Sequence, residues 1–540
     1  MRKFITFFLL VLSCSDVTAQ TSDKGVGVWK SDLGNGMYQN PILWADYSDP
    51  DVCRVDDDYY MVSSSFNCVP GLPLLHSKDL VNWELIGHAL PRLVPQHHFE
   101  TPRHGGGVWA PSIRYHANEF YIYYPDPDFG IYLVKAKDPR GPWSEPVLVA
   151  EGNGLIDPCP FWDDDGKAYL VYAYAGSRAG IKSILAVKQL SADGTKTLDE
   201  GRIVYDGHAL DPTVEGPKFH KRNGYYYIFA PAGGVATGWQ IVLRSKNIYG
   251  LYERKIVMHQ GKTKVNGPHQ GAWVTTPSGE DWFIHFQDLE AYGRVVHLQP
   301  MLWKNDWPVI GEDKDGDGIG EPVQRFKKPD PGMRTAQVAP PESDEFDNPW
   351  LMPQWQWHAN PKATWSFHTP EGKLRLYSQK IPDGARSLWD VPNLLLQKFP
   401  APEFTVTTRI KFHPNEKLTN ETAGLLIMGM DYAWLGIRSG KEGNKLVLAT
   451  CAKADQSGIP SETIVGHVSN GDVYLRVQVR DDAKCFFSYS TDGKRFSELG
   501  KSFQAVPGKW IGAKVGMFCT REAQTNDSGF VDIDWFRNTR

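Results

Sequence analysis

The chain has few cysteines, no concentration of basic residues and no long apolar run beyond its N-terminus. Seven cysteines occur among 540 residues, and no two of them have the CxxC spacing typical of a zinc site. The formal net charge is −5 without any run of Lys and Arg, which argues against a nucleic-acid partner. No segment past the N-terminus is long and apolar enough to span a membrane. The sequence thus disfavours zinc-finger, nucleic-acid-binding and membrane-spanning proteins.

The N-terminus has the order of an export signal. Arg2 and Lys3 precede the apolar run FITFFLLVL and then small residues. Cleavage after Ala19 would make residues 1–19 a signal peptide and leave a periplasmic or secreted protein. Alternatively, VLSC ending at Cys14 is a relaxed lipobox, which would leave a lipid-anchored protein.

Six cysteines lie beyond this signal: Cys53, Cys68, Cys159, Cys451, Cys485 and Cys519. An even number in an exported protein permits disulfides, but a chain of this size does not need them. We therefore expect buried free thiols, with Cys53 and Cys68 as the alternative pair.

Aromatic residues, glycine and proline are abundant, and one aromatic-rich pattern recurs five times. Aromatics make up 12% of the chain, beside 51 Gly and 38 Pro, a composition that suits short strands and turns. Each copy runs from a polar head through an apolar stretch and a tight turn into an aromatic-rich strand. The copies span residues 48–62, 109–124, 156–173, 214–230 and 268–286. A spacing of roughly 50 to 60 residues predicts a five-bladed β-propeller.

The heads of the five copies occupy equivalent positions, about 11 to 13 residues before one aligned aromatic residue of the second strand: Tyr60, Tyr121, Tyr169, Tyr226 and Trp282. These heads are Asp49, Trp109, Asp157, Glu215 and His269. If the copies are blades, the five side chains should face one another near the propeller axis.

A change of pattern marks a second domain. After the fifth copy the sequence gains Gly, Pro and charge, and from about residue 342 it alternates in the manner of a β-sandwich. We predict an all-β protein with a propeller over residues 38–325, a linker over 326–341 and a jelly-roll β-sandwich of concanavalin A type over 342–540. The sandwich tryptophans could form a sugar platform, although packing is favoured; they are Trp350, Trp355, Trp357 and Trp365.

Three of the five heads are carboxylates, and this suggests catalysis. Like charges at close range repel, and burial penalises each of them, so a propeller axis is a poor place for structural carboxylates. Two carboxyl groups in different environments can divide into a general acid and a base, as glycoside hydrolysis requires. The structural alternative is that Asp49 and Asp157, each followed by Pro, only begin strands through Asx turns.

The motifs in residues 38–325 resemble glycoside hydrolase family 43. The segments that carry the resemblance are NPILWADYSDPDV, GGVWAPSIRYH, LIDPCPFWDDDGKAYLVYA, TVEGPKFHKRNGYYYI and GRVVHLQPMLWKNDWPV. The resemblance implies a five-bladed propeller enzyme that acts on xylan- and arabinan-type sugars with inversion. The C-terminal half is similar to the jelly-roll domain that often follows such propellers.

The resemblance assigns roles to individual residues. It implies that Asp49 is the general base, that Glu215 is the general acid, and that Asp157 orients the acid and tunes its pKa. An inverting pair should stand roughly 6.5 to 9.5 Å apart to admit a water molecule.

Binding roles follow from the same resemblance. Phe66 and Trp109 would form walls of the sugar site, with core packing as the alternative for each. Arg294 would reach the sugar and the carboxylate of the acid. His269 would lie beneath the sugar, in some relatives beside a calcium ion, and is also a weak calcium candidate.

A second calcium candidate lies in the segment DKDGDGIGE. Asp313, Asp315 and Asp317 fit the start of an EF-hand loop, but the twelfth position is Gln324 rather than Glu, so a solvated connector is favoured. No cofactor is expected for the chemistry.

We expect an exo-acting, inverting glycosidase that releases terminal xylose or arabinose from plant hemicellulose oligosaccharides derived from xylan, arabinoxylan or xyloglucan. The alternatives are an endo-arabinanase with an open cleft and a carbohydrate-binding protein that has lost catalysis. The three carboxylates count against the second alternative, and the appended sandwich counts against the first.

Overall fold

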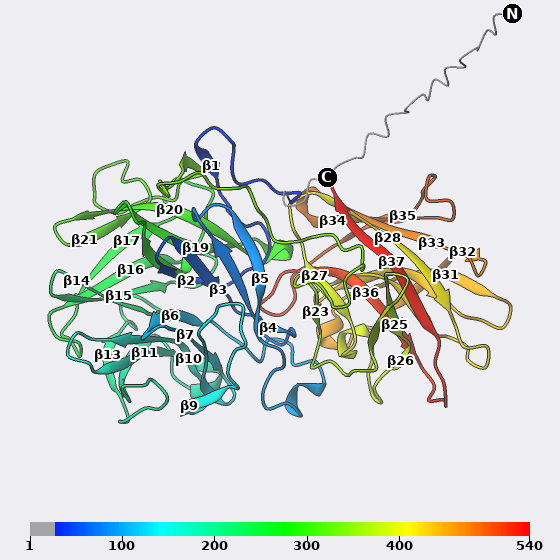
Figure 1. Ribbon diagram of the computed structural model, residues 1–540, viewed down its shortest axis with the longest axis horizontal. Coiled ribbons are helices and arrows are strands. Elements are labelled where there is room, and N and C mark those ends of the chain that lie inside the picture. Colours follow the sequence, from blue (N-terminus) through cyan, green and yellow to red (C-terminus); the bar gives the residue numbers. More distant parts are fainter. Residues whose placement is uncertain (1–26) are drawn as a thin grey trace, which may run out of the picture.

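Five four-stranded antiparallel sheets follow one another along the first part of the chain and surround a common axis (Figure 1). The structure is a computed structural model that describes residues 27–540. The predicted signal peptide and Cys14 lie outside the described residues, so export stays a prediction. Among residues 27–540, no helix has the length and apolar character needed to cross a membrane.

Each blade is one continuous segment of four strands. The first blade consists of β2 (Asp51–Val55), β3 (Asp58–Val62), β4 (Gly71–Ser77) and β5 (Trp83–Leu90). The second consists of β6 (Ser112–His116), β7 (Glu119–Asp126), β8 (Gly130–Ala136) and β9 (Val147–Glu151). The third consists of β10 (Leu155–Trp162), β11 (Ala168–Tyr174), β12 (Ile184–Leu190) and β13 (Arg202–Asp206). The fourth consists of β14 (Lys218–Arg222), β15 (Tyr225–Ala232), β16 (Trp239–Ser245) and β17 (Glu253–His259). The fifth consists of β18 (His269–Thr275), β19 (Asp281–Asp288), β20 (Arg294–Lys304) and β21 (Trp307–Ile310).

Two-residue turns join the first two strands of the first, second and fourth blades and favour their antiparallel pairing. Between β14 and β15, Asn223 and Gly224 have φ angles of 51° and 74°, the left-handed pair that a two-residue hairpin turn needs. Between β6 and β7, Ala117 and Asn118 adopt the same region. In every blade the head lies within three residues of the start of the first strand.

The ring closes without an exchange of strands between blades. Strand β1 (Met37–Gln39) pairs with β22 (Arg325–Lys327), and the Asn40 side chain donates to the carbonyls of Leu298 and Val323. Apolar residues of the first and fifth blades form one core across the seam. The first residues of the propeller are thus fixed against its last blade.

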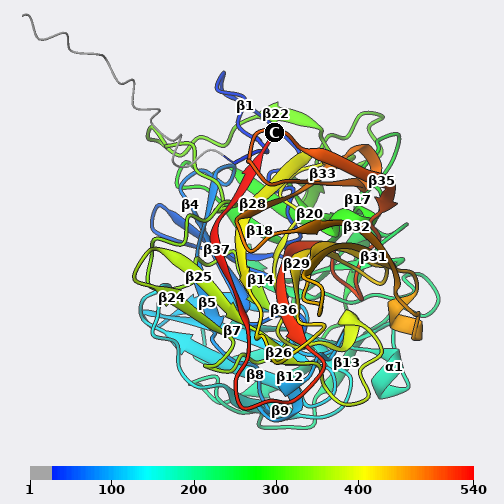
Figure 2. The same cartoon turned by 90° about the vertical axis from the view of Figure 1, so that its right-hand side faces the viewer.

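The C-terminal part is a sandwich of two large sheets, which lies beside the propeller (Figures 1 and 2). One sheet has the order β23 (Gln356–Trp357), β27 (Leu395–Lys398), β36 (Lys514–Arg521), β29 (Thr422–Met428), β30 (Tyr432–Arg438), β31 (Asn444–Cys451) and β32 (Ser461–Val468), with β26 (Gln379–Lys380) pairing with β36. The other has the order β24 (Ser366–Thr369), β25 (Lys373–Tyr377), β37 (Phe530–Thr539), β28 (Phe404–His413), β33 (Val473–Arg480), β34 (Lys484–Ser490) and β35 (Ser497–Gln504). Along β28, buried side chains alternate with partly exposed ones, so one face of the strand lies in the core between the two sheets.

Within residues 27–540, helical structure is confined to short turns. These are α1 (Gly176–Ala179), η1 (His98–Glu100), η2 (Glu290–Tyr292), η3 (Leu388–Asp390), η4 (Ala454–Gln456) and η5 (Asp481–Ala483). The prediction of an all-β protein with a propeller and a concanavalin A-like sandwich is therefore confirmed.

The sandwich packs directly against the propeller. Val69 and Trp357 exchange two backbone hydrogen bonds, and Asn360 bonds the backbone of Leu93. Trp355, Trp357 and Trp365 are buried in the core of the sandwich itself and therefore do not form an exposed sugar platform, whereas Trp350 is exposed.

All six cysteines in the described part of the chain are free. The alternative pairing of Cys53 with Cys68 is therefore wrong. Instead, the Lys514 ammonium group from the sandwich donates to the Cys68 sulfur at 2.9 Å.

Candidate active site

One pocket of about 820 Å³ lies where the inner ends of the five blades meet. All five heads line it, which confirms that the repeated positions face a common centre: Asp49, Trp109, Asp157, Glu215 and His269. Phe66 and Arg294 line the same pocket. The structure thus brings together every residue predicted for catalysis or sugar binding.

Asp49 is buried and held by two side chains. Its Oδ2 accepts a hydrogen bond of 2.7 Å from the Ser64 hydroxyl. Nη1 of Arg294 lies 3.3 Å from both Asp49 oxygens. Because Arg294 is also buried, the pair is shielded from solvent, and removing either partner would leave an uncompensated charge. This arrangement fixes the position of the Asp49 carboxyl group at the edge of the pocket.

Asp157 lies within β10, at a bulge between Ile156 and Cys159. Its Oδ2 accepts hydrogen bonds from the Gly216 amide at 2.7 Å and from the Gln270 side chain at 3.1 Å. The pKa of Asp157 is raised to about 7, chiefly by burial and also by the nearby charges of Glu215 and Asp49. The bond to Gly216 ties this carboxylate to the residue that directly follows Glu215.

Glu215 is partly exposed to the pocket and pairs with His269. Its Oε1 lies 2.7 Å from Nε2 of the buried His269 ring. Its backbone N–H donates to the Pro231 carbonyl, which anchors the segment before β14. The side chain of Glu215 is more exposed than that of Asp49, and Asp157 is fully buried. Of the three carboxyl groups, that of Glu215 is therefore the most accessible from the pocket.

Several pocket residues adopt strained backbone conformations. The positive φ angles are 53° at Asp49, 50° at Phe66, 56° at Asp157, 42° at Gln270 and 67° at Trp510. Asp49 and Asp157 also precede prolines, where an extended conformation is favoured. Such strain in non-glycine residues persists only where the surroundings enforce it, and it clusters at functional sites. The Asx-turn alternative does not explain this clustering in one pocket.

Three aromatic rings form a wall of the pocket. The ring centroids of Phe66 and Trp109 lie 6.3 Å apart, and those of Trp109 and Trp510 lie 6.4 Å apart. The Arg178 guanidinium lies over the Trp109 ring, and the Arg294 guanidinium lies near both Phe66 and Trp510. Flat rings of this kind suit the apolar faces of a sugar.

The placement of Arg294 differs from one expectation. The family resemblance implied that Arg294 reaches the carboxylate of the acid, but its carboxylate partner here is Asp49, whereas Glu215 pairs with His269. The reason is that Arg294 begins β20, beside the segment that carries Asp49 across the closing seam.

Trp510 and Gln270 were not foreseen from the sequence. Trp510 lies in the sandwich loop 505–513, and nothing in the sequence connects that loop with the propeller. Gln270 follows His269, and adjacency was the only signal available for it. Its Oε1 is buried without a partner among the described residues.

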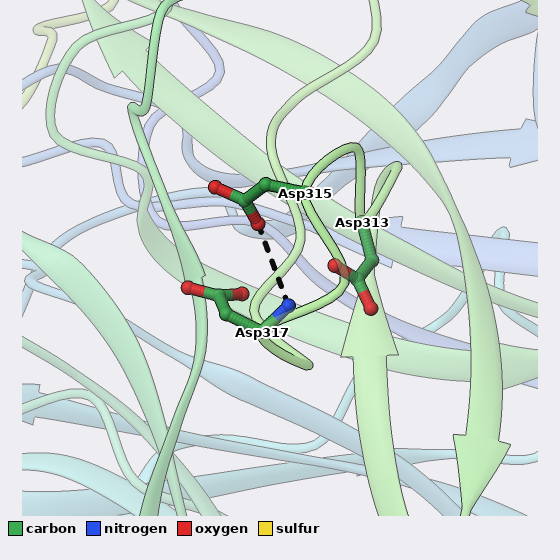
Figure 3. Close-up of side chains that lie close together, drawn as sticks. All are labelled: Asp313, Asp315 and Asp317. Atoms are coloured by element: carbon green, nitrogen blue, oxygen red, sulfur yellow. Dashed lines mark hydrogen bonds between the residues drawn. The ribbon is translucent and has the colours of Figure 1, made fainter.

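The loop after β21 carries Asp313, Asp315 and Asp317, whose side chains lie close together (Figure 3). None of the three lines the pocket described above. One carboxylate oxygen from each of Asp313, Asp315 and Asp317 lies within 4.8 Å of the others, as a hard cation would require. However, the Lys304 ammonium group lies 3.0 Å from Asp313 Oδ2 and competes with a cation for that ligand. Among residues 27–540 this is the one such group of side chains, and His269 belongs to none.

Comparison with known proteins gives the same picture for both parts of the chain. Residues 38–308 match Glycosyl hydrolases family 43, and residues 343–539 match the Beta xylosidase C-terminal Concanavalin A-like domain. A putative beta-xylosidase of Xylanibacter ruminicola is 41% identical over 93% of this chain and 89% of its own. A non-reducing end alpha-L-arabinofuranosidase of Bacteroides ovatus is 30% identical over 95% of this chain and 97% of its own. The crystal structure of a xylan beta-1,4-xylosidase from Bacillus halodurans superposes with a TM-score of 0.82 at 26% identity, covering 93% of this chain and 100% of that one.

Proposed function

Because the chain belongs to glycosyl hydrolase family 43 and is a glycosidase, we propose that it is an inverting enzyme that releases terminal xylose or arabinose from xylan, arabinoxylan or xyloglucan fragments. The names of its relatives support exo-glycosidase activity on such pentoses. The observation that carries the proposal is the meeting of Asp49, Asp157 and Glu215, from three different blades, in one aromatic-lined pocket.

In the proposed reaction, Asp49 accepts a proton from a water molecule as the water oxygen bonds to the anomeric carbon. Glu215 donates its proton to the glycosidic oxygen as the bond from that oxygen to the anomeric carbon breaks. The products are a free pentose of inverted configuration and a shortened oligosaccharide. Asp157 holds the Gly216 amide and thereby fixes the position of Glu215.

A pocket bounded on one side by the sandwich favours removal of a terminal unit over internal cleavage. Trp510, from the sandwich, lines the pocket beside Arg294, so the rim is built by both domains. An endo-acting enzyme would need a groove that is open at both ends.

The proposal is tested with nitrophenyl β-xyloside and nitrophenyl α-L-arabinofuranoside, together with proton NMR of the first sugar anomer formed. Release of nitrophenol with an inverted first anomer is expected. A retained anomer would refute the mechanism, and cleavage of linear arabinan only at internal bonds would refute the exo assignment. Absence of hydrolysis of all these substrates, with sugar binding intact, would support the non-catalytic alternative.

A further inference from the structure

Asp46 precedes the first blade and lies where the fifth blade meets the sandwich. Its side chain is buried, and its two carboxylate oxygens accept hydrogen bonds from two backbone amides. Oδ1 accepts from Arg294 N at 2.9 Å, and Oδ2 accepts from Gly512 N at 2.9 Å. One carboxylate therefore bridges blade five and the sandwich loop 505–513.

Each of these amides belongs to a segment that builds the pocket. Arg294 contacts Asp49 through its guanidinium group, and its backbone is held by Asp46. Trp510 precedes Gly512 by two residues, and its ring lies 5.8 Å from the Arg294 guanidinium. Asp46 itself does not line the pocket, so any effect on catalysis has to pass through these two residues.

The two chain segments approach too closely for any side chain other than hydrogen. A Cβ added at Gly293 would lie 2.6 Å from Asp46 Oδ1 and 2.7 Å from Gly512 N. A Cβ added at Gly512 would lie 2.8 Å from Gly293 N. Real Cβ atoms are essentially never found so close to backbone, so the junction depends on both glycines.

Further hydrogen bonds between the propeller and the sandwich surround Asp46. Ala513 N donates to the Ala291 carbonyl at 2.7 Å, and Ala291 packs in the core of the sandwich. The Tyr292 hydroxyl donates to the Pro402 carbonyl and accepts from Ala483 N. From the sandwich strand β27, the Lys398 ammonium group donates to the Asp46 carbonyl at 2.6 Å.

We propose that Asp46 is a positioning residue. By holding the backbone amides of Arg294 and Gly512, it fixes the positions of the Arg294 and Trp510 side chains in the pocket. The inference rests on the proposed function, an inverting and exo-acting reaction on terminal pentoses. A carboxylate suits this position because it offers two acceptor oxygens for two converging N–H donors. Asparagine has the same shape but replaces one acceptor with a donor, which would face an N–H group.

The test compares Asp46→Asn with Gly512→Ala, which leaves Asp46 intact but displaces the loop. Asn360→Ala is the matched control, because Asn360 also bonds backbone groups of the propeller from the sandwich and does not line the pocket. We measure kcat and KM on the nitrophenyl glycosides, and the melting temperature of each variant.

Asp46→Asn and Gly512→Ala should each lower kcat/KM about 10- to 100-fold, since a displacement of about 1 Å can cost that much. Asn360→Ala should stay within about twofold of the wild type even where its melting temperature falls. The double variant Asp46→Asn/Trp510→Ala should lose much less kcat/KM than the product of the two single fold-losses, as expected for residues that act together.

Three results would overturn the proposal. These are activity of Asp46→Asn within about twofold of the wild type, an equal loss in Asn360→Ala, or losses of Asp46→Asn and Trp510→Ala that multiply. If Asp46→Asn does not fold, Gly512→Ala and its combination with Trp510→Ala decide. Should Asp49→Asn be as active as the wild type, the proposed function fails instead, so the two failures are distinguishable.

Discussion

Nε2 of His269 lies 2.7 Å from Oε1 of Glu215, while Nδ1 of the same buried ring has no partner among residues 27–540. The ring is therefore oriented by one polar contact, and that contact is with the proposed general acid. In return, the histidine limits the rotamers of Glu215 and holds its carboxyl group toward the pocket. We therefore expect His269 to affect the proposed chemistry through the position of Glu215.

Replacing His269 with phenylalanine should lower kcat about 100-fold, because the ring volume is kept while the contact with Glu215 is lost. The matched control is His297→Phe, a second buried histidine in blade five that does not line the pocket. Steady-state kinetics on the nitrophenyl β-xyloside measure both. Equal losses in the two variants would contradict a specific role for His269.

The proposed acid and base should respond differently to the leaving group. Asp49→Asn should lower kcat by about 10³-fold or more on every substrate, since a base is needed whatever group departs. Glu215→Gln should lose as much on xylobiose but far less on a nitrophenyl glycoside, because nitrophenolate departs without protonation. Identical losses on both substrates for Glu215→Gln would argue against its role as the acid.

Asp157 should make stability depend on pH. Its folded-state pKa is raised above the ordinary value of 3.8, chiefly by burial, so the folded protein holds a proton that the unfolded chain has lost between about pH 4 and 7. The free energy of unfolding should therefore fall as pH rises through this interval.

Asp157→Asn should remove this contribution while reducing activity. Relative to wild type, the variant should gain roughly 1 kcal/mol or more of stability between pH 4.5 and pH 8, as measured by urea unfolding at both values. A stability difference that is the same at both pH values would exclude a raised pKa at Asp157.

Chelation of calcium should leave turnover unchanged. The acidic loop of Asp313, Asp315 and Asp317 lies beyond β21 and contributes nothing to the pocket, whose proposed chemistry belongs to carboxyl groups. Activity is measured before and after dialysis against EDTA, with Asp315→Asn as the loop control. Loss of activity on dialysis that calcium restores in the wild type but not in Asp315→Asn would show that this loop supports the active site.

Reducing agents should not change the melting temperature, because all six cysteines from Cys53 to Cys519 are free. Thermal unfolding with and without dithiothreitol provides the measurement. A decrease of several degrees on reduction would reveal a disulfide.

Most of the site could be predicted because its residues occupy equivalent positions in a repeated sequence pattern. Equivalent positions in successive blades must occupy equivalent places around the axis, so Asp49, Asp157 and Glu215 could be grouped from their spacing alone. In three of the blades a two-residue hairpin turn, such as Asn223-Gly224, also sets the register of the first two strands locally. Family motifs then added Phe66 and Arg294, which the repeat by itself would not reveal.

What escaped prediction depends on contacts between distant segments. Trp510 enters the pocket more than 200 residues after the last propeller head, and Arg294 bonds Asp49 rather than Glu215. Local patterns therefore determined the all-β fold, the five blades and the heads that meet in the pocket, because pairing between adjacent strands follows from neighbouring residues. Only the tertiary structure decided which partner each charged group has and how the sandwich completes the pocket, because the Asp46 junction joins amides 248 and 466 positions away from it.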